Sequence, residues 1–110
     1  ADPINAKRQR DLSIGYERLG DILVAEGNLT AARRSYEDAL AISKRLADAD
    51  PTNAECQRDL IVFYVKLNEV TGDRTFVQQA LRIAHTMQQR GVLSPNDGWL
   101  IDDLKRRVGQ

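Results

Sequence analysis

The chain has 110 residues, of which 42% are hydrophobic and 29% charged, and its 16 basic and 16 acidic residues give a formal net charge of +0. This length fits a single domain. The charge balance argues against nucleic-acid binding, because DNA- and RNA-binding proteins carry an excess of positive charge on one face. A single cysteine excludes an internal disulfide, and no apolar run reaches the roughly 20 residues of a membrane span, so we expect a cytoplasmic protein that does not bind membranes.

A segment at the start of the chain recurs 48 positions further on. Residues 1–20 and 49–68 are identical at 11 of 20 positions, and both copies contain the tetrad Gln-Arg-Asp-Leu, at 9–12 and at 57–60. Similarity at one fixed offset indicates that the same structural unit occurs twice. Because the similarity weakens after residue 68, we expect the second unit, 49–91, to be a degenerate version of the first, 1–48.

Apolar residues follow a helical period along the chain, and no stretch alternates as a strand would. We expect five helices, which begin near positions 3, 29, 51, 75 and 95 and end near positions 27, 48, 71, 91 and 108. Gly27 and Gly91 suit helix ends, and Thr75 has Gln78 at the spacing of a capping box. Short loops force consecutive helices to pack antiparallel, which predicts an all-α fold of two hairpins and a C-terminal helix over 95–110.

The expected core consists of one apolar stripe on each helix. On the first helix, residues three or four positions apart form this stripe, and Ile22 widens it. The stripe residues are Leu12, Tyr16, Leu19 and Leu23 on the first helix, then Ala32, Tyr36, Ala39, Leu40, Ser43, Leu46 and Ala47, then Leu60, Phe63, Tyr64, Leu67 and Val70, then Phe76, Val77, Ala80, Leu81, Ile83, Ala84 and Met87, and finally Trp99, Leu100, Leu104 and Val108.

Large, small and aromatic residues follow one another along the first hairpin in the order Tyr16, Leu19, Gly20, Leu23, Ala32, Tyr36 and Ala39. This order resembles the tetratricopeptide repeat. The resemblance implies a short α-solenoid with right-handed stacking, in which Gly20 and Ala32 lie where the two helices of a hairpin touch. The common repeat has about 34 residues, so the longer spacing here is that of an elongated, bacterial-type variant, with the helix at 95–110 as its cap.

The same resemblance implies a scaffold that binds a peptide or helix of a partner protein without catalysis. In this family, the first helix of each hairpin lines the binding groove. The implied groove is apolar with some acidic side chains and lacks the Lys/Asn/Arg set that grips a C-terminal carboxylate, so we expect an apolar or basic segment as partner. The implied groove residues are Ile14, Glu17, Asp21 and Val24 on the first helix and Val62, Val65 and Glu69 on the third.

Reactive side chains are too few to suggest an enzyme. His85 is the only histidine and Cys56 the only cysteine, which disfavours a catalytic pair or a zinc site, and no glycine-rich phosphate loop occurs. We therefore expect His85 to be a helix-surface residue and Cys56 an inert thiol, and we expect no cofactor and no metal.

Three alternatives stay open at the level of the sequence. Arg10 and Arg58 of the two tetrads could form a row that binds peptide, although a role in linking one unit to the next is favoured. Val62 and Val65 could pack under the last helix, with Trp99 as its anchor, rather than face a groove. The chain could also be a structural segment that associates with further copies of itself, in place of binding a different partner.

Overall fold

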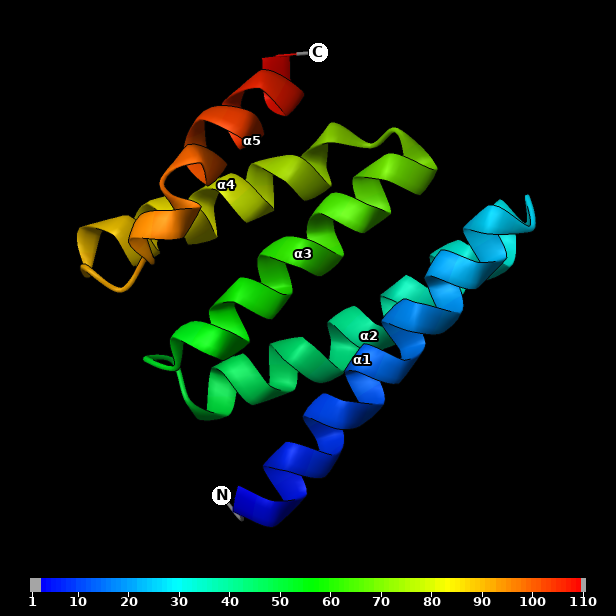
Figure 1. Cartoon of the computed structure of the whole chain (residues 1–110), viewed down its shortest axis with the longest axis horizontal. Helices are drawn as coiled ribbons and strands as arrows, with labels where there is room; N and C mark the ends of the chain where they lie inside the picture. The colour runs from blue at the N-terminus through cyan, green and yellow to red at the C-terminus, as the bar shows by residue number, and fades with distance from the viewer. Residues whose placement is uncertain (1–2, 110) are drawn as a thin grey trace.

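The structure, a computed structural model, describes residues 3–109 and contains five α-helices within them. Each helix packs against the next one in the chain as an antiparallel neighbour (Figure 1). The prediction of an all-α chain with five sequential helices is confirmed. The helices are α1 (Pro3–Ala25), α2 (Leu29–Ala49), α3 (Ala54–Thr71), α4 (Arg74–Gln89) and α5 (Trp99–Gly109), and the 3₁₀ turn η1 (Pro95–Asp97) precedes α5.

Glycines turn the chain between the helices of each pair. Gly27 and Gly72 have φ angles of 80° and 72°, in the left-handed region where a side chain would be strained. After the first turn, the Asn28 side chain accepts a hydrogen bond of 3.2 Å from the backbone N–H of Ala31 and so caps α2. These local signals explain why α1 and α2 form a tight hairpin.

Three predicted helix starts are wrong. Helix α5 begins at Trp99 and not near Pro95, because the 3₁₀ turn η1 occupies Pro95–Asp97. Capping explains the other two. Helix α3 begins at Ala54 and not near Pro51, because the Asn53 side chain accepts a hydrogen bond of 3.1 Å from the backbone N–H of Cys56. Helix α4 is capped by Asp73 and not by Thr75, since the Asp73 carboxylate accepts hydrogen bonds from both the backbone N–H and the hydroxyl of Thr75. Aspartate and threonine are both good caps, and the aspartate comes first in the chain.

The close contact predicted inside the first hairpin is confirmed. Gly20 is buried in α1, and a Cβ atom placed on it would overlap the Tyr36 ring of α2, at 2.7 Å from Cδ1 and 2.8 Å from Cζ. Ala32 is also fully buried, and Tyr36 is only 3% exposed. A glycine at position 20 therefore gives the Tyr36 ring the space in which it packs.

The core lies among α2, α3, α4 and α5, and it includes Tyr36, Phe63 and Leu67. The predicted stripe of α1 is wrong in part, because Leu12 and Leu19 are about half exposed and Ile22 is still more exposed. Tyr16 and Leu23 are partly buried against the core. The reason for this difference is that only α2 packs closely on α1, whereas α2 and α4 both pack on α3.

The last helix buries most of the face that was predicted, because Leu104 is fully buried and Leu100 and Val108 pack against the core. The prediction misses Ile101, which is 5% exposed, and is wrong for Trp99, which is 59% exposed. Helices α1, α3 and α5 all run in the same direction, from lower left to upper right in Figure 1. No helix within residues 3–109 is both long and apolar enough to cross a membrane.

Candidate protein-interaction groove

The residues predicted to form a groove fall into two parts, and the first lies between α1 and α3. Lys66 of α3 donates hydrogen bonds of 2.7 and 2.9 Å to the Asp21 carboxylate, and its Nζ lies 3.1 Å from Oε2 of Glu17. The Tyr36 hydroxyl donates a further hydrogen bond of 2.6 Å to Asp21. The acidic side chains predicted to meet a partner are therefore paired within the chain.

The pKa values of Lys66 and Asp21 reflect this pairing. Burial opposes the charged form of Lys66, but its hydrogen bonds to Asp21 and Glu17 outweigh burial and raise the pKa of the ammonium group. Burial likewise opposes the Asp21 carboxylate, and the hydrogen bonds from Lys66 and Tyr36 outweigh it and lower the pKa of Asp21. Lys66 therefore ties α1 to α3. The surface beside it is still hollowed, because Asp21 and Val24 of α1 line a pocket of about 230 Å³ together with Lys66 and Glu69 of α3.

The second part lies between α3 and α5, and it is hollowed. Val62 and Val65 of α3 line a groove of about 190 Å³ together with Trp99 and Leu100 of α5. Both valines are partly buried, so α5 flanks them without covering them. The predicted packing of Val62 and Val65 under α5 is thus incomplete. The exposed indole of Trp99 lines this groove.

Charged residues border the groove. The carboxylate of Glu69 lies 3.5 Å from the guanidinium of Arg107, which also pairs with Asp103 at 2.9 Å. Hydrogen bonding to Asp103 raises the pKa of Arg107 despite partial burial. The groove is therefore an apolar strip with a polar edge, the arrangement found in protein–protein interfaces.

Trp99 and Leu100 were not among the predicted groove residues, although the sequence contains a signal that points to them. A proline is followed nine positions later by Leu, with Asp just before the Leu, three times along the chain. In this alignment α5 corresponds to the first helix of each earlier unit, which places its residues beside the groove. The three matching segments are Pro3 to Asp11-Leu12, Pro51 to Asp59-Leu60 and Pro95 to Asp103-Leu104.

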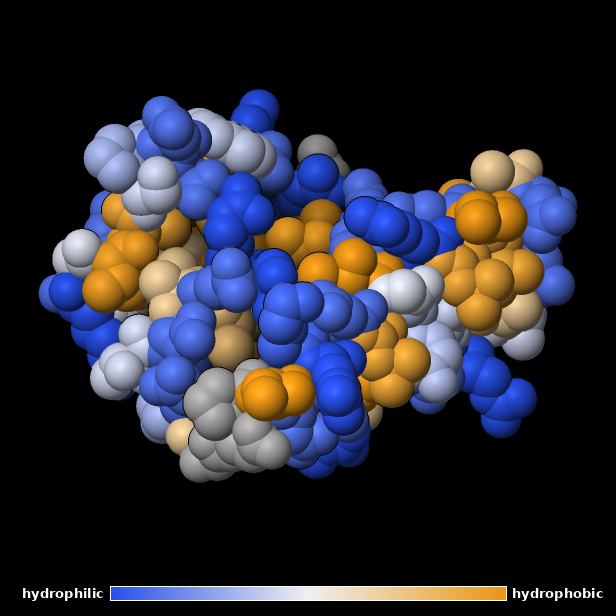
Figure 2. All heavy atoms as spheres, turned by 60° about the horizontal axis from the view of Figure 1, so that its bottom comes forward, coloured by the Kyte–Doolittle hydropathy of each residue, from blue (hydrophilic) through white to orange (hydrophobic). Residues whose placement is uncertain are grey.

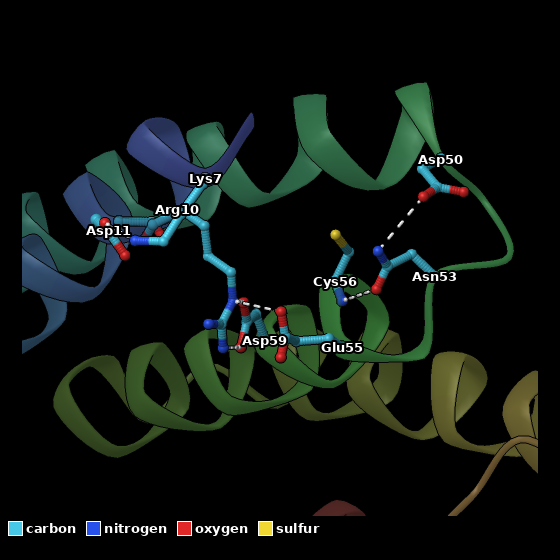
Figure 3. A network of polar contacts seen from close by, with 9 residues as sticks. Lys7, Arg10, Asp11, Asp50, Asn53, Glu55, Cys56 and Asp59 are labelled. Carbon is cyan, nitrogen blue, oxygen red and sulfur yellow. Dashed lines mark hydrogen bonds and ion pairs between the residues drawn. The ribbon is translucent and has the colours of Figure 1, made fainter. Parts of the chain in front are cut away.

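The arginines of the two tetrads link neighbouring units, as favoured from the sequence. Arg10 of α1 reaches α3, where its Nε lies 2.8 Å from the Asp59 carboxylate and 3.3 Å from Glu55 (Figure 3). Arg58 of α3 reaches η1 and binds both oxygens of Asp97 at 2.9 Å. Hydrogen bonding to Arg58 lowers the pKa of Asp97, whose side chain is nearly buried. Both arginines therefore serve the packing of the chain.

Cys56 lies beside the same junction, on the first turn of α3 (Figure 3). Burial, followed by the charge of Asp59, raises the pKa of its thiol, which disfavours the reactive thiolate. His85 is partly buried on α4. Within residues 3–109, no three His, Cys, Asp or Glu side chains are grouped closely enough to hold a metal ion.

Comparison of the chain with protein-family models, with curated proteins and with solved structures finds no match in any of the three. The tetratricopeptide resemblance therefore stays a prediction, and a function must be argued from the groove itself.

Proposed function

We propose that the chain is a tetratricopeptide-like α-solenoid segment, cytoplasmic and non-catalytic, that binds a peptide or helix of a partner protein between α3 and α5. The observation that carries this proposal is the exposed indole of Trp99 on the wall of an apolar groove. Tryptophan is among the residues most enriched where binding energy concentrates at interfaces. A large aromatic side chain left in water beside Val62 and Val65 gains most from a partner that covers it.

The groove also limits what the partner can be. Its floor offers Val62, Val65 and Leu100, so the partner needs apolar side chains on one face. At its edge, Glu69 is 54% exposed in its side chain and keeps carboxylate surface available despite its contact with Arg107. The lining also contains Arg58, Lys66 and Arg107, each of which is paired with a carboxylate of the chain. An apolar segment therefore fits best, and a basic residue is accommodated only beside Glu69.

The ion pairs of Lys66 disfavour a binding site on α1. Ile14, Glu17, Asp21 and Val24 were predicted to line the groove on α1, but Lys66 already pairs with the two carboxylates. Reversing the charge of Glu17 or Asp21 would separate α1 from α3 as well as alter any binding surface. A test of binding is therefore cleaner on the α3–α5 side.

Trp99 provides the test, because it is the only tryptophan of the chain. Helical and extended peptides selected by display on the full chain should shift its emission to shorter wavelength on binding, since the indole leaves water. Val65→Asp should weaken binding by at least about tenfold, as expected for a charge placed at a desolvated contact. Val92→Asp is the matched control, because Val92 is exposed but does not line the groove, and it should bind normally. Equal binding by both variants would refute the proposed site.

A further inference from the structure

The apolar face of α1 differs in exposure from the equivalent faces of α3 and α5. Leu12 of α1 is 48% exposed, whereas Leu60 and Leu104, at the same position of the three-fold sequence pattern, are 6% and 0% exposed. Leu19 is 47% exposed, whereas Leu67, 48 positions later, is fully buried. The same apolar face is therefore covered on α3 and uncovered on α1.

The helix that covers this surface is identified by the neighbours of each copy. Helix α3 packs on α4, its own hairpin partner, and also on α2 of the unit before it. In the same way, α5 packs on α4 of the unit before it. Among the described residues, α1 packs closely on one helix only, its hairpin partner α2. What α1 lacks is therefore a helix in the position that α2 holds toward α3.

Two further pairs of equivalent residues, Gly15 with Phe63 and Asp11 with Asp59, also indicate that α1 lacks a neighbouring helix. Gly15 of α1 has nothing within 4 Å of a Cβ placed on it, whereas its equivalent Phe63 is 1% exposed. Asp59 receives Arg10 from the preceding unit, while its equivalent Asp11 pairs with Lys7 of its own helix, both side chains being well exposed. Within residues 3–109, Gly15 and Asp11 therefore lack the contacts with a neighbouring unit that Phe63 and Asp59 have.

A basic residue marks the other end of this face. Lys66 of α3 reaches back to Glu17 and Asp21 of the preceding unit, and the residue 48 positions before it is Arg18, which is exposed on α1. An acidic residue of a preceding unit would meet Arg18 just as Glu17 and Asp21 meet Lys66. Apolar surface is visible at the end of the molecule where α1 meets α2, at the right of Figure 2.

We propose that the uncovered face of α1, formed by Leu12, Gly15, Leu19 and Ile22, is a docking surface for a further helical hairpin of the same repeat type. The second helix of that hairpin lies on α1 as α2 lies on α3, with a small and apolar face. Its first helix presents a basic residue to Asp11 and acidic residues to Arg18. A second folded copy of this chain does not fit this description, because its α2 is already covered by α1 on one side and α3 on the other.

The chain itself supplies the probe. Adding a copy of residues 1–48 directly before Ala1 places a hairpin ahead of α1 with the linker Ala-Asp-Pro in its native register, because the same tripeptide follows Asp48. The extended protein should unfold in one transition, with a midpoint at least about 5 °C above that of the original chain, since each stacked repeat adds an interface.

The same substitution, Leu19→Glu, placed in either copy of the extended protein tests where the added hairpin docks. Leu19→Glu in the original copy of the extended protein should cancel the gain in midpoint, because it places a charge in the new interface. The same substitution in the added copy, whose α1 is now the uncovered end, should change the midpoint by less than about 4 °C, as a surface change does.

Three results would overturn the proposal, two on the extended protein and one on the original chain. The first two are an extended protein whose two Leu19→Glu variants are equally stable, or one whose added hairpin leaves the midpoint unchanged. The third is a dimer of the original 110-residue chain, seen by light scattering, that Leu19→Glu dissociates, because a second copy would then be the occupant. A monomeric original chain together with a stabilised extended protein supports it.

Discussion

Replacing Gly20 by alanine should destabilise the fold, although the same replacement at Gly15, in the same helix, should stabilise it. Alanine in place of glycine inside a helix is worth about 0.5–1 kcal/mol by itself. At Gly15 this gain is all that is expected, because nothing lies within 4 Å of the new methyl group. At Gly20 the methyl group would overlap three atoms of the Tyr36 ring.

The Tyr36 ring cannot move aside without further cost, because it is 3% exposed and its hydroxyl is held by Asp21 at 2.6 Å. Overpacking of this kind costs about 1–3 kcal/mol, and loss of the hydrogen bond to Asp21 adds about 1 kcal/mol. After subtraction of the helical gain, Gly20→Ala should lower the free energy of unfolding by about 2 kcal/mol, or the melting temperature by about 10 °C.

Urea denaturation followed by circular dichroism measures both variants on one scale. The two alanine variants should differ by about 2.5–3 kcal/mol with opposite signs. In a Tyr36→Ala background, where the ring is absent, Gly20→Ala should become neutral or stabilising, because the clash is removed. If Gly20→Ala is as stable as Gly15→Ala in the original chain, the packing of Gly20 on Tyr36 is wrong.

Other predictions follow from single contacts. Tyr36→Ala should lower the free energy of unfolding by about 3–5 kcal/mol in urea, as a buried aromatic truncation does, and an unchanged melting temperature would refute its core position. Arg58→Ala should cost about 1–3 kcal/mol, because the Asp97 carboxylate is left nearly buried without its partner, whereas an unaffected variant would show that the pair contributes nothing. Because Arg58 keeps the folded pKa of Asp97 below its ordinary value of about 4, Asp97 stabilises the fold above that value and loses this contribution as pH falls through the lower folded pKa. Urea midpoints measured between pH 5 and pH 3 should therefore decline less in Asp97→Asn than in the original chain. Cys56 should react with a thiol reagent at pH 8 more slowly than in urea, because burial raises the pKa of its thiol, and equal rates would contradict that placement.

The sequence predicts the helices and hairpin turns well because the signals that form them are local. Gly27 ends α1 through its left-handed conformation. Gly20 was expected where α1 touches α2, but that it lies against the Tyr36 ring was not predicted. Helix starts were less accurate, since Asp73 and Thr75 are both competent caps and periodicity does not choose between them.

Burial of the apolar stripes was harder to predict, because a stripe shows which face of a helix is apolar and not whether another helix covers it. Leu19 and Leu67 belong to the same pattern, yet one is half exposed and the other buried. The burial of Trp99 was predicted wrongly for a related reason. An aromatic residue at the start of a helix gives the same sequence pattern whether it packs in a core or lines a groove. Only the third occurrence of the Pro-to-Asp-Leu pattern would have placed it correctly.

The most direct test of the proposed binding site is a heteronuclear NMR titration of the full chain with a peptide selected by display. The proposal predicts that the largest chemical-shift changes fall on Val62, Val65, Leu100 and the indole N–H of Trp99. Residues on the uncovered face of α1, such as Leu12 and Leu19, should keep their shifts. Changes that concentrate on α1, or that spare Trp99 while the peptide binds, would contradict a partner-binding groove between α3 and α5.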